Sequence, residues 1–243
     1  MAGTRDDKVT AIGRTDSNDS IILMTSSESA TMELIRESPG DLFDAPNGAA
    51  LIHACNCQGL WGAGLARKFR DRYPAAYEIY RKHCLQGLEK PVTHLIPKLS
   101  DEESHPSLIV QQPLGTALII PPQQSDFALH RRRHWIICLF ASNHYGSRVD
   151  SEEMILNSTF AALRHMREQL QGSFYSSSQP DNDRPMGFYS SRFCTGLFNI
   201  PWECIRDLIV RVGVPINVYH PFEPNTRRAR PLPLQRPAEA RQN

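Results

Sequence analysis

The sequence predicts an α/β sandwich, and three observations carry that prediction. Short apolar runs, separated by Pro, Gly and polar clusters, are typical of buried strands. Segments with the apolar spacing or the start signals of helices lie between several of these runs. Two glycine-containing segments, the first glycine loop (56–64) and the second glycine loop (193–199), each join an apolar run to a helix start. In an open α/β sheet, ligands bind outside the carboxyl ends of the strands, where such loops meet.

In the N-terminal part, we expect two strands followed by two helices. The runs "TMELIRE" (31–37) and "AALIHAC" (49–55) predict the strands, with a turn-rich segment between them. The first helix is expected to begin near Gly62. Pro74 suits the first position of a second helix over 74–84, because the first N–H groups of a helix are unpaired and proline has none.

The middle of the chain is rich in strand patterns. Four apolar runs predict strands over 93–97, 107–112, 115–121 and 135–141. Insertions near 99–106 and 122–133 are predicted to be surface loops. The second insertion ends in "RRR" (131–133), which fits either a phosphate-binding patch or a solvated loop.

The strongest helix pattern spans residues 151–170. Asp150 or Ser151 is a suitable N-cap, and acidic residues occupy the first turn. One face of the helix is predicted to be buried: Ile155, Thr159, Ala162, Leu163, Met166 and Leu170.

The pattern after this helix is a loop insertion near 172–189 and then the second glycine loop. A helix is predicted over 201–212, with Pro201 at its first position, and a closing strand over 215–221.

Length and composition fit one well-packed domain. The chain has 243 residues, of which 40% are hydrophobic, and a formal net charge of +1. We place the domain at residues 30–220, between a mobile polar tail (1–29) and a disordered Pro- and Arg-rich tail (221–243). The near-zero charge gives no support for a nucleic-acid partner. No apolar run approaches the ~20 residues of a membrane span, so we expect no membrane partner.

The six cysteines fit buried thiols in a reducing compartment better than a disulfide framework. Cys138 lies inside one apolar run, and Cys55 ends another. The spacing of Cys55 and Cys57 is not that of a zinc site, and no second Cys or His pair completes one. We therefore expect no metal and no cofactor.

The first glycine loop, "NCQGLWGAG", matches neither common nucleotide motif. Gly59 and Gly64 have the P-loop separation, yet Leu65 and Ala66 follow where Lys and Ser or Thr are needed. Arg67 stands in place of the third glycine of the dinucleotide fingerprint. Glycine still lets the backbone approach a ligand, and a helix N-terminus offers free N–H groups to an anion. An anion site and an ordinary strand-to-helix connection are both compatible with this spacing.

Longer motifs make the chain resemble the macrodomain family. The segment "SPGDLFDAP…LIHACNCQGLWGAGLARKF" is most similar to the fungal ADP-ribose 1″-phosphate phosphatases, and "GTALIIPP", "HWIICLFAS" and "GLFNIPWE" follow in the family's order. The resemblance covers roughly residues 30–220. It implies a three-layer α/β/α domain with a mixed, mainly six-stranded sheet, and ADP-ribose or a derivative as the ligand.

The resemblance also implies which residues bind this ligand. Asp41 would accept a hydrogen bond from the adenine amino group, although an Asx-turn also explains this residue. Asn56 would hold the distal ribose, or merely stabilise the strand end. Trp61 would wall the pocket or belong to the core. The full implied set is Gly40, Asp41, Leu42, Ala54, Cys55, Asn56, Trp61, Gly62, Ala63, Gly64, Leu65, Ala66, Thr195, Gly196, Leu197, Phe198 and Asn199.

The second glycine loop departs from the family pattern. Phe193 and Cys194 replace an Ile–Asn pair, and Asn199 replaces a glycine. Because Asn tolerates a left-handed backbone better than most residues, we expect the turn to survive. Because Cys194 lacks the amide side chain of the family's Asn, we expect an effect on ligand affinity or on the rate of turnover.

Three activities are compatible with such a domain. It could remove the terminal phosphate of ADP-ribose 1″-phosphate, release ADP-ribose from modified carboxylates, or bind ADP-ribose without chemistry. Related macrodomains that release ADP-ribose from proteins use a Lys after the central strand and an Asp in the second loop. Here Ser142, Asn143 and His144 follow that strand, and Phe198 occupies the Asp position. We therefore favour the phosphatase.

His53 and Asn56 are the candidate catalytic residues. An imidazole near a strand end can orient or deprotonate water at neutral pH, but a core histidine is also compatible with this position. His144 and Asp150 are weaker candidates. We expect a monomer that acts on ADP-ribose 1″-phosphate or binds ADP-ribose, in the cytoplasm or also in the nucleus.

Overall fold

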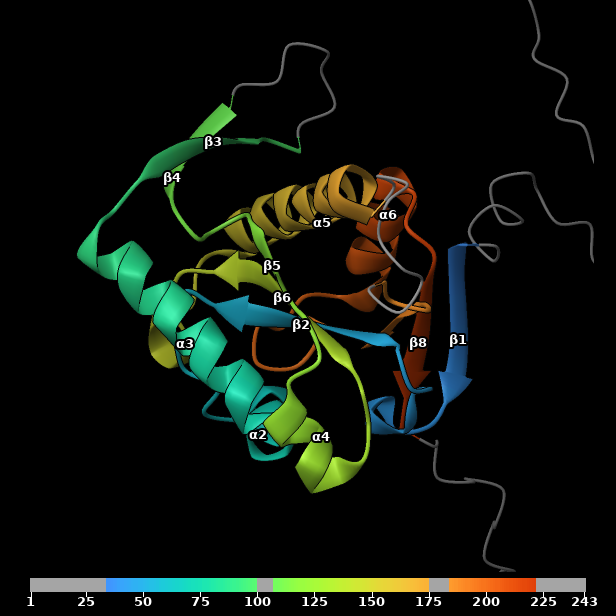
Figure 1. Cartoon of the computed structure of the whole chain (residues 1–243). Helices are drawn as coiled ribbons and strands as arrows, with labels where there is room; N and C mark the ends of the chain where they lie inside the picture. Colours follow the sequence, from blue (N-terminus) through green and yellow to red (C-terminus); the bar gives the residue numbers. More distant parts are fainter. Residues whose placement is uncertain (1–33, 100–106, 175–183, 222–243) are drawn as a thin grey trace, which may run out of the picture.

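The structure is a computed structural model that describes residues 34–99, 107–174 and 184–221 (Figure 1). The predicted N-terminal tail lies outside the described residues, as does the C-terminal tail after Pro221.

A mixed six-stranded sheet forms the middle layer, as predicted. Its strands lie in the order β1-β8-β7-β2-β6-β5, and only β5 runs antiparallel to its neighbour. Their bounds are β1 Ile35–Pro39, β2 Ala50–Asn56, β5 Ala117–Ile120, β6 Trp135–Ser142, β7 Phe188–Ser191 and β8 Ile216–His220. The parallel central strands bring several strand ends to one edge.

Helices cover both faces of the sheet and complete the three predicted layers (Figure 1). One face carries α2 (Gly64–Arg72), α3 (Pro74–Glu89) and α4 (Gln124–His130). The other face carries α5 (Glu152–Phe174) and α6 (Trp202–Val212). Two short 3-10 turns, η1 (Leu42–Asp44) and η2 (Gly146–Arg148), lie in the connections.

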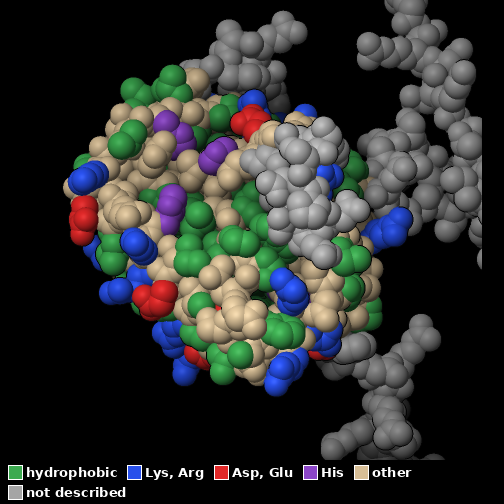
Figure 2. Space-filling view, viewed as in Figure 1, with side chains coloured by type: hydrophobic (Ala, Val, Ile, Leu, Met, Phe, Trp, Pro, Cys, Tyr) green, Lys and Arg blue, Asp and Glu red, His purple; other side chains and the backbone are tan. Residues whose placement is uncertain are grey.

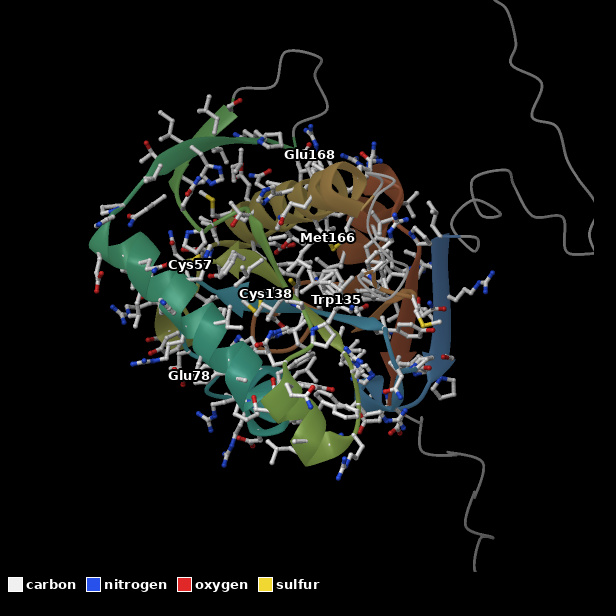
Figure 3. All side chains as sticks on the ribbon, in the orientation of Figure 1. Cys57, Glu78, Trp135, Cys138, Met166 and Glu168 are labelled. Atoms are coloured by element: carbon white, nitrogen blue, oxygen red, sulfur yellow. The ribbon has the colours of Figure 1, made fainter. Side chains whose placement is uncertain are left out.

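Strands β2 and β6 are buried on both faces, which explains their continuous apolar sequences. Side chains alternate along β2, so Ile52 packs toward α5 and α6 while Leu51 and Cys55 pack toward α2 and α3. The same division separates Met166, on α5, from Cys57 and Cys138 in the opposite core cluster; all three are labelled in Figure 3. The predicted apolar face of the 151–170 helix is buried at all six positions.

Strands β3 (Thr93–Pro97) and β4 (Ser107–Gln111) pair only with each other, as an antiparallel ladder outside the main sheet. Leu95 lies opposite Ile109, and these side chains are 63% and 75% exposed. The space-filling view shows hydrophobic side chains gathered over this part of the surface (Figure 2).

The prediction of a surface loop over 122–133 is wrong for residues 124–130, which form α4. The reason is a long-range contact. The Asp126 side chain is buried, and its two carboxylate oxygens accept hydrogen bonds from the backbone N–H groups of Ala75 and Ala76. It therefore satisfies the first turn of α3, where Pro74 stands at the first position as predicted.

Other boundaries differ by a few residues from the predicted ones. The first helix begins at Gly64 rather than Gly62, and Pro201 is the N-cap of α6 rather than its first residue. Strand β1 begins at Ile35, and residues 31–33 of the predicted strand lie outside the described residues. The insertion predicted near 172–189 is shorter at both ends, because α5 continues to Phe174 and β7 begins at Phe188.

All six cysteines are unpaired, and five of them are buried. None of the described helices is long and apolar enough to span a membrane.

Candidate functional site

The two glycine loops meet at the carboxyl edge of the central strands. The first follows β2 and the second follows β7. A Cβ placed on Gly64 would lie 3.7 Å from Cδ1 of Leu197, so the loops approach each other directly. A hollow of about 510 Å³ lies elsewhere, lined by Lys98 and Leu99, which follow β3, and by α5 residues such as Asn157. We locate the site from the loops, because backbone N–H groups at strand ends, rather than hollow size, determine anion binding.

Asn56 shapes the first glycine loop. Its Nδ2 donates to the carbonyl of Leu60 at 2.7 Å, and its Oδ1 accepts from the backbone N–H of Gln58 at 2.9 Å. The Tyr80 hydroxyl lies 3.2 Å from the same Oδ1 and donates to the backbone carbonyl of Asn56 at 2.8 Å. The amide therefore stabilises the strand end, as one sequence interpretation held, and contact with a ribose stays a prediction.

The end of the first glycine loop offers an anion site. Gly64 has a φ of 55°, a conformation that favours glycine, and starts α2. The N-cap residue, Ala63, makes no side-chain hydrogen bond to the helix. The first-turn N–H groups of α2 are therefore left for a ligand or water, in the positive end of the helix dipole.

The second glycine loop keeps its turn despite the departures from the family pattern. Asn199 has a φ of 54° and donates its N–H to the carbonyl of Gly196 at 3.0 Å, so the predicted left-handed turn is present. Cys194 is also left-handed, with a φ of 64°. Burial raises the pKa of the Cys194 thiol to about 12, so this thiol stays protonated and is not a nucleophile.

Asp41 forms the Asx-turn that was one of its two sequence interpretations. Its Oδ1 accepts from the backbone N–H of Phe43 at 3.0 Å and caps η1, which is the Asx-turn. The residue is exposed and follows Gly40, where an added Cβ would lie only 2.9 Å from Cδ1 of Tyr219. The carboxylate can still accept a second hydrogen bond, so contact with adenine stays a prediction.

Asp150 is the last residue of the wall loop, residues 143–150, which contacts the first glycine loop through Asn143. Its Oδ2 accepts from the backbone N–H of Asn143 and lies 3.1 Å from the Ser142 hydroxyl. The backbone carbonyl of Asn143 accepts two hydrogen bonds from the first glycine loop. The donors are the Cys57 N–H, at 3.2 Å, and the Gln58 Nε2, at 3.0 Å. The carboxylate is thus fixed beside the first glycine loop rather than capping α5.

The cap of α5 is Ser151, whose Oγ accepts from the backbone N–H of Met154 at 3.3 Å. The sequence left Asp150 and Ser151 as alternatives for this cap. Because Ser151 caps the helix, the carboxylate of Asp150 is free to serve the candidate site.

Sequence comparisons place the chain among named relatives. No protein-family model matches it. A protein of Neosartorya fischeri is 45% identical over 189 residues, and one of Aspergillus fumigatus is 46% identical over 190 residues. Each alignment covers 77% of this chain and 94% of the relative, and both relatives are named ADP-ribose 1″-phosphate phosphatase. The chain belongs to the ADP-ribose 1″-phosphate phosphatase family.

Solved structures support the fold of this phosphatase family member. The macrodomain of Mycobacterium tuberculosis DarG superposes with a TM-score of 0.52 at 19% identity, covering 77% of this chain and 98% of that one. Thermosipho africanus DarTG in complex with ADP-ribose gives 0.53 at 15% identity, covering 78% and 42%. At these identities the likeness shows the macrodomain fold alone.

Within this phosphatase fold, some predicted ligand residues face the core. Trp61 is fully buried and stacks on Tyr80 with ring centroids 4.8 Å apart, so it is a core residue rather than an exposed pocket wall. Leu42 and Cys55 are 3% and 2% exposed. Only the backbones of these residues can reach a ligand without rearrangement.

The remaining predicted positions flank the ligand edge. Gly62, Ala63, Gly196 and Leu197 are exposed, whereas Ala54, Leu65, Ala66, Thr195 and Phe198 are half-buried.

His53 lies in the same core layer. The imidazole is 2% exposed and stacks on Phe69, with centroids 4.0 Å apart and ring planes 8° apart. Its two nitrogens lie 3.5 and 3.7 Å from Sγ of Cys55. A general base must reach the attacking water directly or through one water molecule. The burial therefore argues for a packing role, and a catalytic role stays a prediction.

We expect His53→Ala to destabilise the protein by about 2–4 kcal/mol, because it leaves a cavity against Phe69. His53→Phe refills this space and can stack, but has no proton acceptor. If packing is the whole role, His53→Phe recovers turnover to within about tenfold of the wild type. Phosphate release and thermal unfolding, measured on both variants, check this. If a stable His53→Phe variant were as slow as His53→Ala, the imidazole would have a catalytic role beyond packing.

One cluster among the described residues has the composition of a metal site. Potential ligand atoms of His53, Cys55 and Cys138 lie within 4.8 Å of one another, all buried. Burial, followed by the neighbouring Cys138, raises the pKa of the Cys55 thiol well above its ordinary value. Because metal ligation requires the thiolate, this environment opposes binding. The absence of a metal therefore stays our prediction.

Proposed function

We propose that this chain hydrolyses ADP-ribose 1″-phosphate to ADP-ribose and phosphate. The observation that carries the proposal is the meeting of the two glycine loops, with the uncapped start of α2 facing Leu197 of the second loop. This arrangement suits a ligand with more than one phosphate. The shared name of relatives that align over most of the domain supplies the substrate.

Binding in this proposal is divided among three places. Asp41 accepts a hydrogen bond from the adenine amino group. Backbone N–H groups of the two glycine loops hold the phosphates, with Asn56 keeping the first loop in shape. The distal ribose and its 1″-phosphate then lie between Asn56 and the wall loop.

The reaction is the attack of water on the terminal phosphorus. A bond forms between the water oxygen and phosphorus, the bond from phosphorus to O1″ breaks, and O1″ leaves with a proton as the hydroxyl of ADP-ribose. Asp150 is the best-placed carboxylate for taking the proton of water, because it is half-buried and fixed beside the first glycine loop. Loop N–H groups stabilise charge on the phosphoryl oxygens.

A reader function, binding ADP-ribose without chemistry, is the second candidate. It is favoured by the burial of His53, which keeps this candidate imidazole away from the surface of the site. Release of ADP-ribose from proteins is less well supported. Ser142 ends β6, and Asn143 and His144 follow it, so there is no lysine at this position. Phe198 likewise provides no acid in the second glycine loop.

We expect the purified protein to bind ADP-ribose in the micromolar range, about −7 to −8 kcal/mol, and AMP more weakly because AMP lacks the distal phosphate and ribose. It should release phosphate from ADP-ribose 1″-phosphate. Calorimetry and a phosphate assay measure the two, with an ADP-ribosylated protein as a parallel substrate. Tight binding without phosphate release would favour the reader. An absence of heat with millimolar ADP-ribose would remove both functions.

A further inference from the structure

Glu37, on β1, ties together the two ends of the segment that contains the second glycine loop. Its Oε2 accepts from Arg192 twice, from Nε at 3.0 Å and from Nη2 at 2.8 Å. Its Oε1 accepts from the indole Nε1 of Trp202 at 2.9 Å, and Arg206 of α6 lies 3.6 Å from it. Arg192 immediately precedes the loop, and Trp202 follows it by three residues. One carboxylate therefore joins both ends of the loop to the edge strand.

The segment held in this way is strained. Cys194 and Asn199 both have left-handed backbones, at φ 64° and 54°, although neither is glycine. Such conformations carry an energetic cost in non-glycine residues and persist only where their surroundings over-determine them. Hydrogen bonds such as Thr195 Oγ1 to the Arg192 carbonyl at 2.6 Å and Asn199 N–H to the Gly196 carbonyl close the turn. At its start the loop is also held by the Phe193 N–H, which donates to the carbonyl of Ser191 at the end of β7, and by Cys194 Sγ, which lies 3.8 Å from Thr159 Oγ1 on α5. Glu37 adds the link that joins the start and the end of the segment to the edge strand.

The Glu37 contacts are stronger than an ordinary surface pair. Arg192 presents two donors to one oxygen, and the indole N–H occupies the other, so the carboxylate is geometrically fixed. Burial alone raises the pKa of Glu37, but the hydrogen bonds from Trp202 and Arg192, with the charges of Arg192 and Arg206, outweigh it. The pKa of this carboxyl lies below its ordinary value, so Glu37 is ionised at neutral pH.

We propose that Glu37 is a positioning residue, which holds the second glycine loop in the strained form that presents its N–H groups to the phosphates of the ligand. The proposal rests on the proposed ligand, and it assigns Glu37 to the phosphate part of that ligand rather than to the adenosine part. Asp41, four residues further along the chain, is assigned to the adenosine part. Its side chain is held separately, by the hydrogen bond that it accepts from the Phe43 N–H.

The test compares two ligands on Glu37→Gln. Glutamine keeps the shape of the side chain but loses the charge, and it can offer only one acceptor oxygen to Arg192 and Trp202. We expect ADP-ribose affinity to fall about tenfold or more, by calorimetry, while adenosine affinity, by NMR shift titration at millimolar concentration, changes less than twofold. Glu203→Gln, at an exposed acid on α6 without an ion pair among the described residues, is the matched control and should change neither.

A second variant separates positioning from general destabilisation. Asn199→Gly relieves a left-handed residue on the exposed part of the loop. The Glu37→Gln, Asn199→Gly double variant should bind ADP-ribose at least about threefold more tightly than Glu37→Gln alone. Equal losses of adenosine and ADP-ribose affinity in Glu37→Gln, or no recovery in the double variant, would overturn the proposal. Wild-type phosphate release is followed in parallel, so a missing activity would count against the phosphatase and leave this affinity comparison intact.

Discussion

Replacing Asp150 with asparagine is expected to lower phosphate release from ADP-ribose 1″-phosphate by about 10²-fold or more, while ADP-ribose affinity changes less than about threefold. The amide oxygen of asparagine can still accept the hydrogen bond from the Asn143 N–H, so the wall loop keeps its shape. The amide cannot take a proton from water. Help of this kind is expressed in the transition state and little in the ground state, which is why binding is spared.

Single-turnover phosphate release and calorimetry with ADP-ribose measure the two effects. Glu152→Gln is the matched control, because Glu152 is an exposed acid two residues away in the first turn of α5. Thermal unfolding of both variants checks the fold. If a folded Asp150→Asn protein kept its full rate, the carboxylate would be a support of the wall loop alone, and another group would have to accept the proton.

Much of the fold could be predicted because local patterns determine it. The buried face of the 151–170 helix, Pro74 at the start of α3 and the apolar runs of β2 and β6 follow from periodicity and start signals within a few residues. Helix α4 could not be predicted in this way. Its short sequence has weak periodicity, and Asp126 contacts Ala75 across some 50 positions.

The site was predictable where glycine determines the backbone. The two glycine loops lie at strand ends as expected, and Asn199 adopts the left-handed turn. The depth of His53 was not predictable, because β2 is buried on both faces and has no polar side to show which residues approach the ligand. The depth of Trp61, in the first glycine loop, depends on its stacking against Tyr80 of α3, which no local pattern shows. Sequence reasoning missed Glu37, whose partner Trp202 is 165 positions away. An acid inside an exposed strand pattern gives no local signal of such a contact.

Replacing Asn56 with alanine is expected to weaken ADP-ribose binding by about 10²-fold, roughly 2.7 kcal/mol, and to lower turnover as well. The change removes the hydrogen bonds that fix the Leu60 carbonyl and the Gln58 N–H, so the first glycine loop loses the shape that aims its N–H groups at the phosphates. Unsatisfied partners in a partly buried loop also cost about 1–3 kcal/mol each in stability.

The matched control for Asn56→Ala is Gln58→Ala. That variant removes the side-chain link to the Asn143 carbonyl but keeps the backbone N–H that Asn56 binds, so it should lose far less affinity. Calorimetry with ADP-ribose, together with thermal unfolding, distinguishes the two variants. If Asn56→Ala lowered the melting temperature but bound ADP-ribose as tightly as the wild type, the amide would serve the fold alone. An equal loss in both variants would mean that ligand binding depends as much on the attachment of the first glycine loop to the Asn143 carbonyl, which the Gln58 side chain provides, as on the Asn56 amide.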